Sequence, residues 1–294
     1  MGIRRTVSMI LAALLAVVSG GTAQAGEQQL LFYNHAWGTY DRVTADAVEH
    51  SSYLRAFADF EVRTTTGAGG EVWTGRYLRG RETYLEIFGV GDVPGQDGLL
   101  GSAGLGLSTE HDGDITAVRS RLAASGVPPF EFVQTRDFGD HVPVPWFDAV
   151  LGFEQYDRFG AWAMEYRDEY FADPRGQTQP ARYPGDVGRE RYLPDNYRDR
   201  LMRDITFVRL AVTERDFAST VPLLRAGGFK LKADAGGVTA LRGGTTMRFD
   251  KVRMGQTGLK RIEFALNRGV ARHEERIGNS TLVVGPGRHA VWTF

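Results

Sequence analysis

The side chains that could do chemistry lie in short segments whose apolar residues alternate as in β-strands. His35 is in LFYNHAWGTY, Glu86 in TYLEIF and Glu165 in AWAMEY. Because side chains on a strand alternate between its two faces, His35 is expected to share a face with Tyr33 and Trp37. A carboxylate among aromatic and aliphatic neighbours is costly to bury alone, and a metal ion or a histidine would be a suitable partner.

Each of these residues also has a purely structural interpretation. His35 could be a core histidine that is hydrogen-bonded to a carboxylate or a backbone carbonyl. Glu86 and Glu165 could form ion pairs with nearby arginines, for example Arg76 or Arg81 for Glu86. The aromatic side chains could pack in the core or form a cage around a substrate; they are Tyr33, Trp37, Tyr84 and Trp162.

Several catalytic motifs are absent from the sequence. It has no G-x-S-x-G elbow, no G-x-x-x-x-G-K-[ST] loop and no H-E-x-x-H helix, which argues against serine hydrolases, nucleotide hydrolases and zincins. The chain has no cysteine, so thiol nucleophiles, disulfides and zinc–thiolate sites are excluded. The formal net charge is -1, so no long-range field would recruit nucleic acid or an anionic membrane, and a small molecule is the expected partner.

Two segments, DGDITAVRSRLAASG and TERDFASTVPLLRAGG, carry the signals of a helix that joins two strands. Asp114 is the expected N-cap of the first helix and Gly126 its stop. Thr213 and Asp216 resemble a capping box at the start of the second. A short apolar run precedes each helix, and glycine leads into another apolar run after it. The opening stretch predicts a third copy of this pattern, followed by a hairpin that turns at Gly80.

The repeated unit is therefore a strand, a helix and about three strands, a β-α-β-β-β module. We place module one at 29–90, module two at 103–170 and module three at 204–266. The sequence predicts an α+β fold in which these modules form curved mixed sheets with the helices outside. The expected domains are a paired-module domain at 26–170, a Pro-, Gly- and Arg-rich connection at 171–203, and a third module with a C-terminal hairpin at 204–294.

Residues 1–25 have the composition of a signal peptide. Arg4 and Arg5 precede a short apolar run, and Ala23-Gln24-Ala25 forms an A-x-A cleavage site. We therefore expect a secreted or periplasmic protein with no membrane attachment after cleavage. The general secretory and twin-arginine routes both remain open.

The module order and three segments, FYNHAW, TYLEIF and AWAMEY, resemble the vicinal oxygen chelate superfamily, which includes glyoxalase I, extradiol dioxygenases and antibiotic-binding resistance proteins. With the C-terminal WTF, they more specifically resemble an uncharacterised secreted bacterial family within it. In that superfamily, metal ligands come from the first and last strands of paired modules. The resemblance implies His35, Glu86 and Glu165 as ligands that face one cavity, for Fe²⁺, Mn²⁺, Ni²⁺ or Zn²⁺.

The sequence departs from the superfamily pattern at the first strand of module two. AGLGLST offers only Gly104, Leu105, Gly106 and Leu107 where a histidine or glutamine is expected. Either the metal keeps open positions for water and substrate, or the site no longer binds metal.

Two functions from different classes follow from this resemblance. One is a metal-dependent lyase, isomerase or dioxygenase that chelates adjacent substrate oxygens, with Glu86 or Glu165 as a catalytic base. The other is a metal-free protein that binds and sequesters a small molecule. A structural domain with a filled pocket is the third possibility, and a homodimer is possible because this fold often builds its site from dimeric modules.

Overall fold

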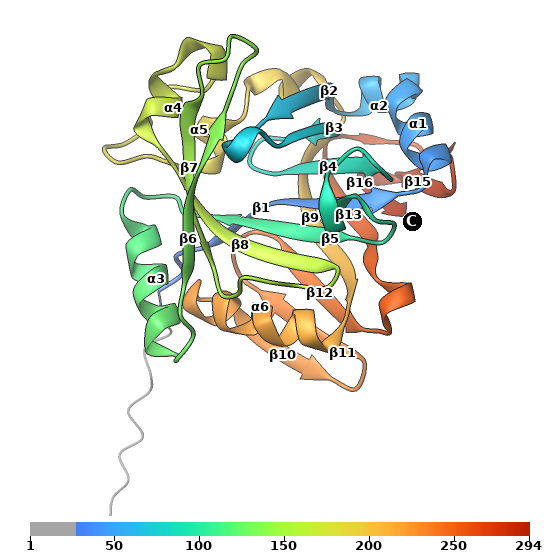
Figure 1. Cartoon of the computed structure of the whole chain (residues 1–294). Helices are drawn as coiled ribbons and strands as arrows, with labels where there is room; N and C mark the ends of the chain where they lie inside the picture. The colour runs from blue at the N-terminus through green and yellow to red at the C-terminus, as the bar shows by residue number, and fades with distance from the viewer. Residues whose placement is uncertain (1–27) are drawn as a thin grey trace, which may run out of the picture.

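The computed structural model describes residues 28–294 (Figure 1), so the signal peptide expected at residues 1–25 lies outside the described residues. The chain forms two mixed sheets of eight strands each, in the orders β2-β3-β4-β1-β5-β8-β7-β6 and β10-β11-β12-β9-β13-β16-β15-β14. Within the described part of the chain, no helix is long and apolar enough to cross a membrane.

The first sheet is built from residues 32–166. Its strands are β1 (Phe32–Tyr40), β2 (Asp59–Thr66), β3 (Val72–Arg79), β4 (Tyr84–Gly89), β5 (Ala103–Ser108), β6 (Phe130–Arg136), β7 (Val144–Leu151) and β8 (Phe159–Tyr166). The second sheet contains β9 (Met202–Val212), β10 (Lys230–Asp234), β11 (Gly237–Leu241), β12 (Thr246–Lys251), β13 (Gly258–Val270), β14 (His273–Ile277), β15 (Ser280–Val284) and β16 (Gly287–Thr293).

The α-helices connect these strands. They are α1 (Arg42–His50), α2 (Ser52–Phe57), α3 (Asp114–Ala124), α4 (Asp168–Ala172), α5 (Arg189–Tyr192) and α6 (Glu214–Ala226). Short 3₁₀ turns are η1 (Ala68–Gly70), η2 (Gly95–Gly98), η3 (Pro174–Gly176), η4 (Asp195–Asp199) and η5 (Met254–Gln256). Helix α6 begins as the capping signal predicts, because the Thr213 side chain accepts a hydrogen bond from the backbone N–H of Asp216 at 3.1 Å.

The module order confirms the predicted α+β fold of curved mixed sheets. In the first sheet β1 pairs parallel to β4, β5 pairs parallel to β8, and β1 runs antiparallel to β5 at the centre. In the second sheet β9 pairs parallel to β12 and antiparallel to β13. Each sheet therefore consists of two half-sheets that join side by side.

The second sheet contains one more half-sheet than the sequence analysis expects. The third module ends with β12. Strand β13, most of which lies within the bounds 204–266 predicted for that module, is the first strand of a fourth unit. This unit goes from β13 to β14 without a helix. Without the helix the chain reverses its direction one time fewer. As a result β16 pairs antiparallel to β13, whereas the equivalent strands of the first sheet, β8 and β5, pair parallel. The missing helical period explains why the sequence showed only a final hairpin there.

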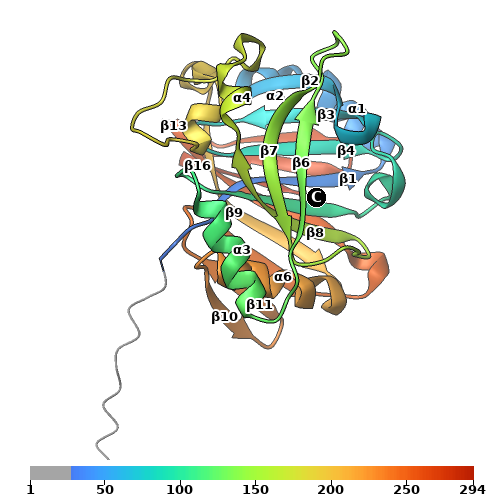
Figure 2. The same cartoon turned by 60° about the vertical axis from the view of Figure 1, so that its left-hand side comes forward.

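The two sheets share one apolar core. One face of each sheet packs toward the other, and α6 of the second half lies against β8 and α3 of the first (Figure 2). The opposite face of the first sheet, which we call the cup face, turns away from this core. The sheet curls so strongly that its two edges meet: Thr66, the last residue of β2, forms a bridge with Asp137, which directly follows β6. The cup is thereby narrowed at one end.

The connection at 171–203 packs against the cup and contributes buried side chains. The Tyr192 ring stacks on Tyr166 of β8, with centroids 4.1 Å apart. Arg189 is buried, and its guanidinium donates hydrogen bonds to the Tyr33 carbonyl at 2.6 Å and to Glu110 at 2.5 Å. The polar composition of this segment therefore serves specific contacts with the first sheet.

Asp216 joins the two halves of the molecule. Its fully buried carboxylate on α6 accepts hydrogen bonds from the backbone N–H groups of Asp157, Arg158 and Phe159, at 2.7, 2.9 and 3.0 Å.

We predict that Asp216→Asn lowers the free energy of unfolding by about 2 kcal/mol, because an amide accepts fewer of these bonds. Urea unfolding measures this, with the exposed Asp199→Asn as the control. Equal stability of the two variants would contradict it.

Candidate functional site

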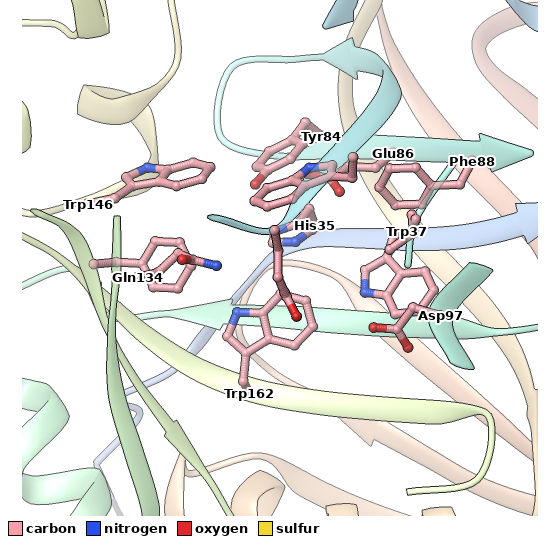
Figure 3. Close-up of a pocket in the computed structure, with 13 residues that line it drawn as sticks. His35, Trp37, Tyr84, Glu86, Phe88, Asp97, Gln134, Trp146 and Trp162 are labelled. Atoms are coloured by element: carbon pink, nitrogen blue, oxygen red, sulfur yellow. The ribbon is translucent and has the colours of Figure 1, made fainter. Parts of the chain in front are cut away.

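A cavity of about 180 Å³ opens on the cup face of the first sheet. Four of the five tryptophans in the chain line it, together with three acidic residues and one histidine (Figure 3). The lining residues are His35, Trp37, Glu71, Trp73, Tyr84, Glu86, Phe88, Val93, Asp97, Gln134, Trp146, Phe147 and Trp162. They come from β1, β3, β4, β6, β7 and β8 and from the turns at either end, so both half-sheets contribute.

His35 is held between aromatic rings at the base of the cavity. Its ring stacks on Tyr84 of β4, with centroids 4.4 Å apart and planes 15° apart. The Trp162 ring of β8 meets it edge-on at 5.3 Å. The side chain is 4% exposed, and burial lowers the pKa of His35 to about 3, so the imidazole is neutral at physiological pH.

Asn34 sets the tautomer of this histidine. Its amide nitrogen donates to the Ser108 hydroxyl at 3.1 Å and to the Tyr166 hydroxyl at 3.0 Å. Its carbonyl oxygen is therefore the group that lies 2.9 Å from His35 Nδ1 and accepts the proton there. Nε2 is left with a lone pair and makes no hydrogen bond to any described residue.

The glycines of β5 have a packing role. A Cβ added at Gly106 would lie 2.2 Å from the His35 ring, and one added at Gly104 would lie 2.2 Å from the Trp37 indole. Both rings cross β5 at closest approach, so only glycine fits beneath them. The His35 ring, which comes from β1, thus fills the space that the side chain of a metal ligand on β5 would need.

Glu86 is buried in the cavity without a partner. Its side chain is 9% exposed and forms no hydrogen bond or ion pair with the other described residues. The arginines that could have paired with it bind elsewhere, Arg76 to Asp92 and Arg81 to Asp204. Burial raises the pKa of Glu86 to about 7, and the Arg63 guanidinium opposes this shift only in part.

The other polar residues of the lining, Asp97, Gln134 and Glu71, are less buried than His35 and Glu86. Asp97 accepts a hydrogen bond from the Tyr156 hydroxyl at 2.7 Å, and burial raises the pKa of Asp97. Gln134 of β6 uses its carbonyl oxygen to accept from the backbone N–H of Ala68 at 2.8 Å, which ties the two edges of the cup together. Glu71 is exposed to solvent.

Glu165 does not join this site. Trp162 lines the cavity, and Met164 and Tyr166 pack on the same side of β8, so the even-numbered residues of this strand lie on the cup face. Glu165 therefore lies on the core face. The Glu165 carboxylate accepts hydrogen bonds from the backbone N–H groups of Gly113 and Ile115, at 2.9 and 3.0 Å. It caps α3 from a distant strand. This explains why α3 begins at Asp114 with Gly113 as its cap, one residue before the expected start.

The strand register shows which residues are equivalent in the two half-sheets. His35 stands opposite Tyr84, and Gly106 stands opposite Trp162. Two residues farther along β4 and β8 lie Glu86 and Met164. The counterparts of His35 and Glu86 are therefore Gly106 and Met164, neither of which is a good ligand for a hard divalent ion.

The residues present do not fit the expected metal. Protein sites for Fe²⁺, Mn²⁺, Ni²⁺ or Zn²⁺ usually supply three or four side-chain donors. Only His35 and Glu86 remain of the expected set, and the described residues contain no group of three or more histidine, cysteine, aspartate or glutamate side chains that could hold a metal. The predicted centre of His35, Glu86 and Glu165 is not formed.

The aromatic residues divide between the two faces. Trp37, Tyr84 and Trp162 line the cavity, whereas Tyr33 is part of the core. A register shift between Tyr33 and His35 in β1 breaks the alternation that would have placed both on one face. Sequence reasoning also missed Trp73 and Trp146. The only sequence signal for them is their position in strand-like, alternating segments.

We predict that Glu165 is a structural residue. Glu165→Ala leaves two backbone donors at the start of α3 without an acceptor, so the free energy of unfolding should fall by about 2 kcal/mol. Chemical denaturation measures this, with Glu154→Ala as a control at an exposed carboxylate. A loss no larger than that of the control would contradict this role.

The raised pKa of Glu86 predicts a pH-dependent stability. Between its ordinary value of 4.5 and about 7, the folded state keeps a proton that the unfolded state has released. The stability contributed by this proton is present at low pH and is lost as the pH rises through 7. Relative to the wild type, Glu86→Gln should therefore gain about 2 kcal/mol in unfolding free energy between pH 5 and pH 8.

Urea unfolding at both pH values measures this gain. Glu263→Gln is the control, because Arg261 and His289 hold the pKa of Glu263 below its usual range, and burial opposes them. A difference between the wild type and Glu86→Gln that does not change with pH would show that Glu86 is ionised in the folded protein at pH 5.

Of the solved structures named below, the first shares the fold of this chain with a TM-score above 0.5. No curated protein matches the chain. A hypothetical protein from Staphylococcus aureus is 10% identical, with a TM-score of 0.52 over 86% of this chain and 97% of that chain. A Mn(II)-bound glyoxalase from Novosphingobium aromaticivorans is 9% identical, with a TM-score of 0.41 over 89% of this chain and 81% of that chain. The 2,3-dioxygenase LapB from Pseudomonas sp. KL28 is 12% identical, with a TM-score of 0.44 over 89% of this chain and 91% of that chain.

The similarity to the Staphylococcus aureus protein is at the level of the fold alone. The model of one protein family matches residues 33–294, which covers both sheets. The chain therefore belongs to the family of unknown function DUF5829.

Proposed function

We propose that this protein binds a small organic molecule in the cavity of the first sheet, without a metal ion. The observation that carries the proposal is a cavity that gathers four tryptophans around a buried carboxylate with no partner among the described residues. A domain with a purely structural role would gain stability by filling this space and by pairing or replacing Glu86.

The size and composition of the cavity suit a small ligand. Sites for drug-sized molecules have volumes of roughly 300–1,000 Å³, and this cavity is smaller, at about 180 Å³. Its walls are mostly aromatic, with a few polar groups that would orient a ligand, namely His35 Nε2, Glu86 and the amide nitrogen of Gln134. The signal peptide expected at residues 1–25 would place such a binding protein outside the cytoplasm.

A second candidate is an enzyme that transfers protons without a metal. The observation that favours it is that Glu86, with a pKa of about 7, lines the same cavity as the His35 lone pair. The metal-dependent lyase, isomerase or dioxygenase implied by the superfamily resemblance has less support, because two of its four donor positions are Gly106 and Met164.

The metal-free binding proposal is tested with the purified chain and three probes that share one ring: benzyl alcohol, phenylacetate and benzyltrimethylammonium. Most tryptophans line the cavity, so tryptophan fluorescence reports on its occupancy. We expect at least one probe to bind saturably, and we expect its dissociation constant to change less than twofold after dialysis against EDTA or addition of Mn²⁺ or Ni²⁺.

A pair of matched variants locates the binding. Val93 lines the cavity, whereas Val90 on the same turn is 41% exposed and does not. Val93→Trp should abolish binding, and Val90→Trp should leave it unchanged. Binding that survives Val93→Trp would overturn the proposal, and so would failure of these three probes together with failure of choline and 3,3-dimethylbutan-1-ol. Binding that requires added metal would restore the metal-dependent alternative.

A further inference from the structure

The charges around the cavity indicate the class of ligand. Building on the proposed function, we propose that the ligand is a small organic cation, whose positive charge would lie beside Glu86 between aromatic rings. The cavity is lined by three carboxylates, Glu71, Glu86 and Asp97, and no lysine or arginine is among the described residues that line it. His35 also lines the cavity, and burial lowers the pKa of its imidazole to about 3, so it contributes no positive charge at physiological pH.

Aromatic side chains surround the buried carboxylate. Trp37 and Phe88 flank it on β1 and β4, where their rings meet edge-on with centroids 5.9 Å apart. Trp162 and Trp146 lie across the cavity, as Figure 3 shows. The faces of such rings are electron-rich, and they attract a cation within roughly 6 Å, most strongly where water is excluded. Indole and carboxylate groups therefore favour the same charge here.

The second sheet provides an internal comparison. On its face away from the core, Glu263 of β13 accepts from Arg261 at 2.7 Å and lies 3.1 Å from His289. Asp250 of β12 is likewise paired, with Arg209 at 2.5 Å and Arg248 at 2.8 Å. The carboxylates there are neutralised by the protein's own side chains.

The first sheet leaves its cup-face carboxylate without such a partner. The nearest candidate, Arg63 of β2, lies over the Tyr77 ring at 4.3 Å and pairs with Glu61 at 3.2 Å. The positive charge that Glu86 lacks is the charge that a bound cation would bring. The cavity volume of about 180 Å³ limits this cation to a small body, such as an ammonium group with a few methyl groups or one ring.

The test compares choline with its uncharged carbon isostere, 3,3-dimethylbutan-1-ol, by isothermal titration calorimetry at pH 8. The two molecules have the same shape, so the difference in affinity isolates the charge. We expect choline to bind the wild type at least tenfold more tightly than the alcohol. This comparison needs no variant and does not depend on how any substitution folds.

Glu86→Gln and Glu263→Gln then assign the effect to one carboxylate. We expect Glu86→Gln to weaken choline binding at least tenfold and to weaken binding of the alcohol by a much smaller factor, so that the preference for choline over the alcohol is lost. Glu263→Gln should change neither. Equal affinities of the wild type for choline and the alcohol, or choline binding unaffected by Glu86→Gln, would overturn the cation inference.

The two proposals fail in distinguishable ways. Binding of benzyl alcohol or phenylacetate without binding of choline or benzyltrimethylammonium would overturn the cation inference and leave the metal-free binding function in place. Absence of binding by every one of these five probes would overturn both. Cation binding that persists in Val93→Trp would place the cation outside the cavity, which also overturns the inference.

Discussion

The site depends on one close contact at the centre of the first sheet, where the His35 ring lies over Gly106. A Cβ at that glycine would lie 2.2 Å from the ring, so any other residue would displace the histidine. The ring would then lose its stack on Tyr84 and its hydrogen bond to Asn34. The same glycine removes a donor from the second half-sheet. One packing constraint thus fixes the orientation of the histidine and leaves the cavity without a full set of metal ligands.

The two sheets show that one spatial order of strands can support different surfaces. Both have a central antiparallel pair of strands flanked by half-sheets, and both pack one face into the shared core. The other face of the second sheet carries carboxylates that are paired with arginines. The corresponding face of the first sheet carries aromatic rings around Glu86, and the contact between Thr66 and Asp137 narrows the cup that this face forms. Function therefore has to be argued from the site and not from the fold.

Much of the fold could be predicted from local signals. The start of α6 after Thr213 and the end of α3 just before Gly126 depend on nearest-neighbour chemistry, so short segments were sufficient. The fourth unit was missed because it has no helix and thus no change of period to mark it. The composition of residues 171–203 predicts only a connection, yet Arg189 and Tyr192 are buried against the first sheet.

The sequence by itself determined which side chains are available to the site. It has no cysteine, it places aromatic residues in alternating segments, and it puts His35 and Glu86 on strands of one module. Only the tertiary structure decided which side chains meet. The side-chain period of a strand is two residues, so an offset of one position moves a residue to the opposite face. The register shift beside His35 sends Tyr33 into the core, and the register of β8 gives Met164 the place that Glu165 was expected to fill. Such offsets depend on pairing between strands that are far apart in the chain, so no local sequence pattern predicts them.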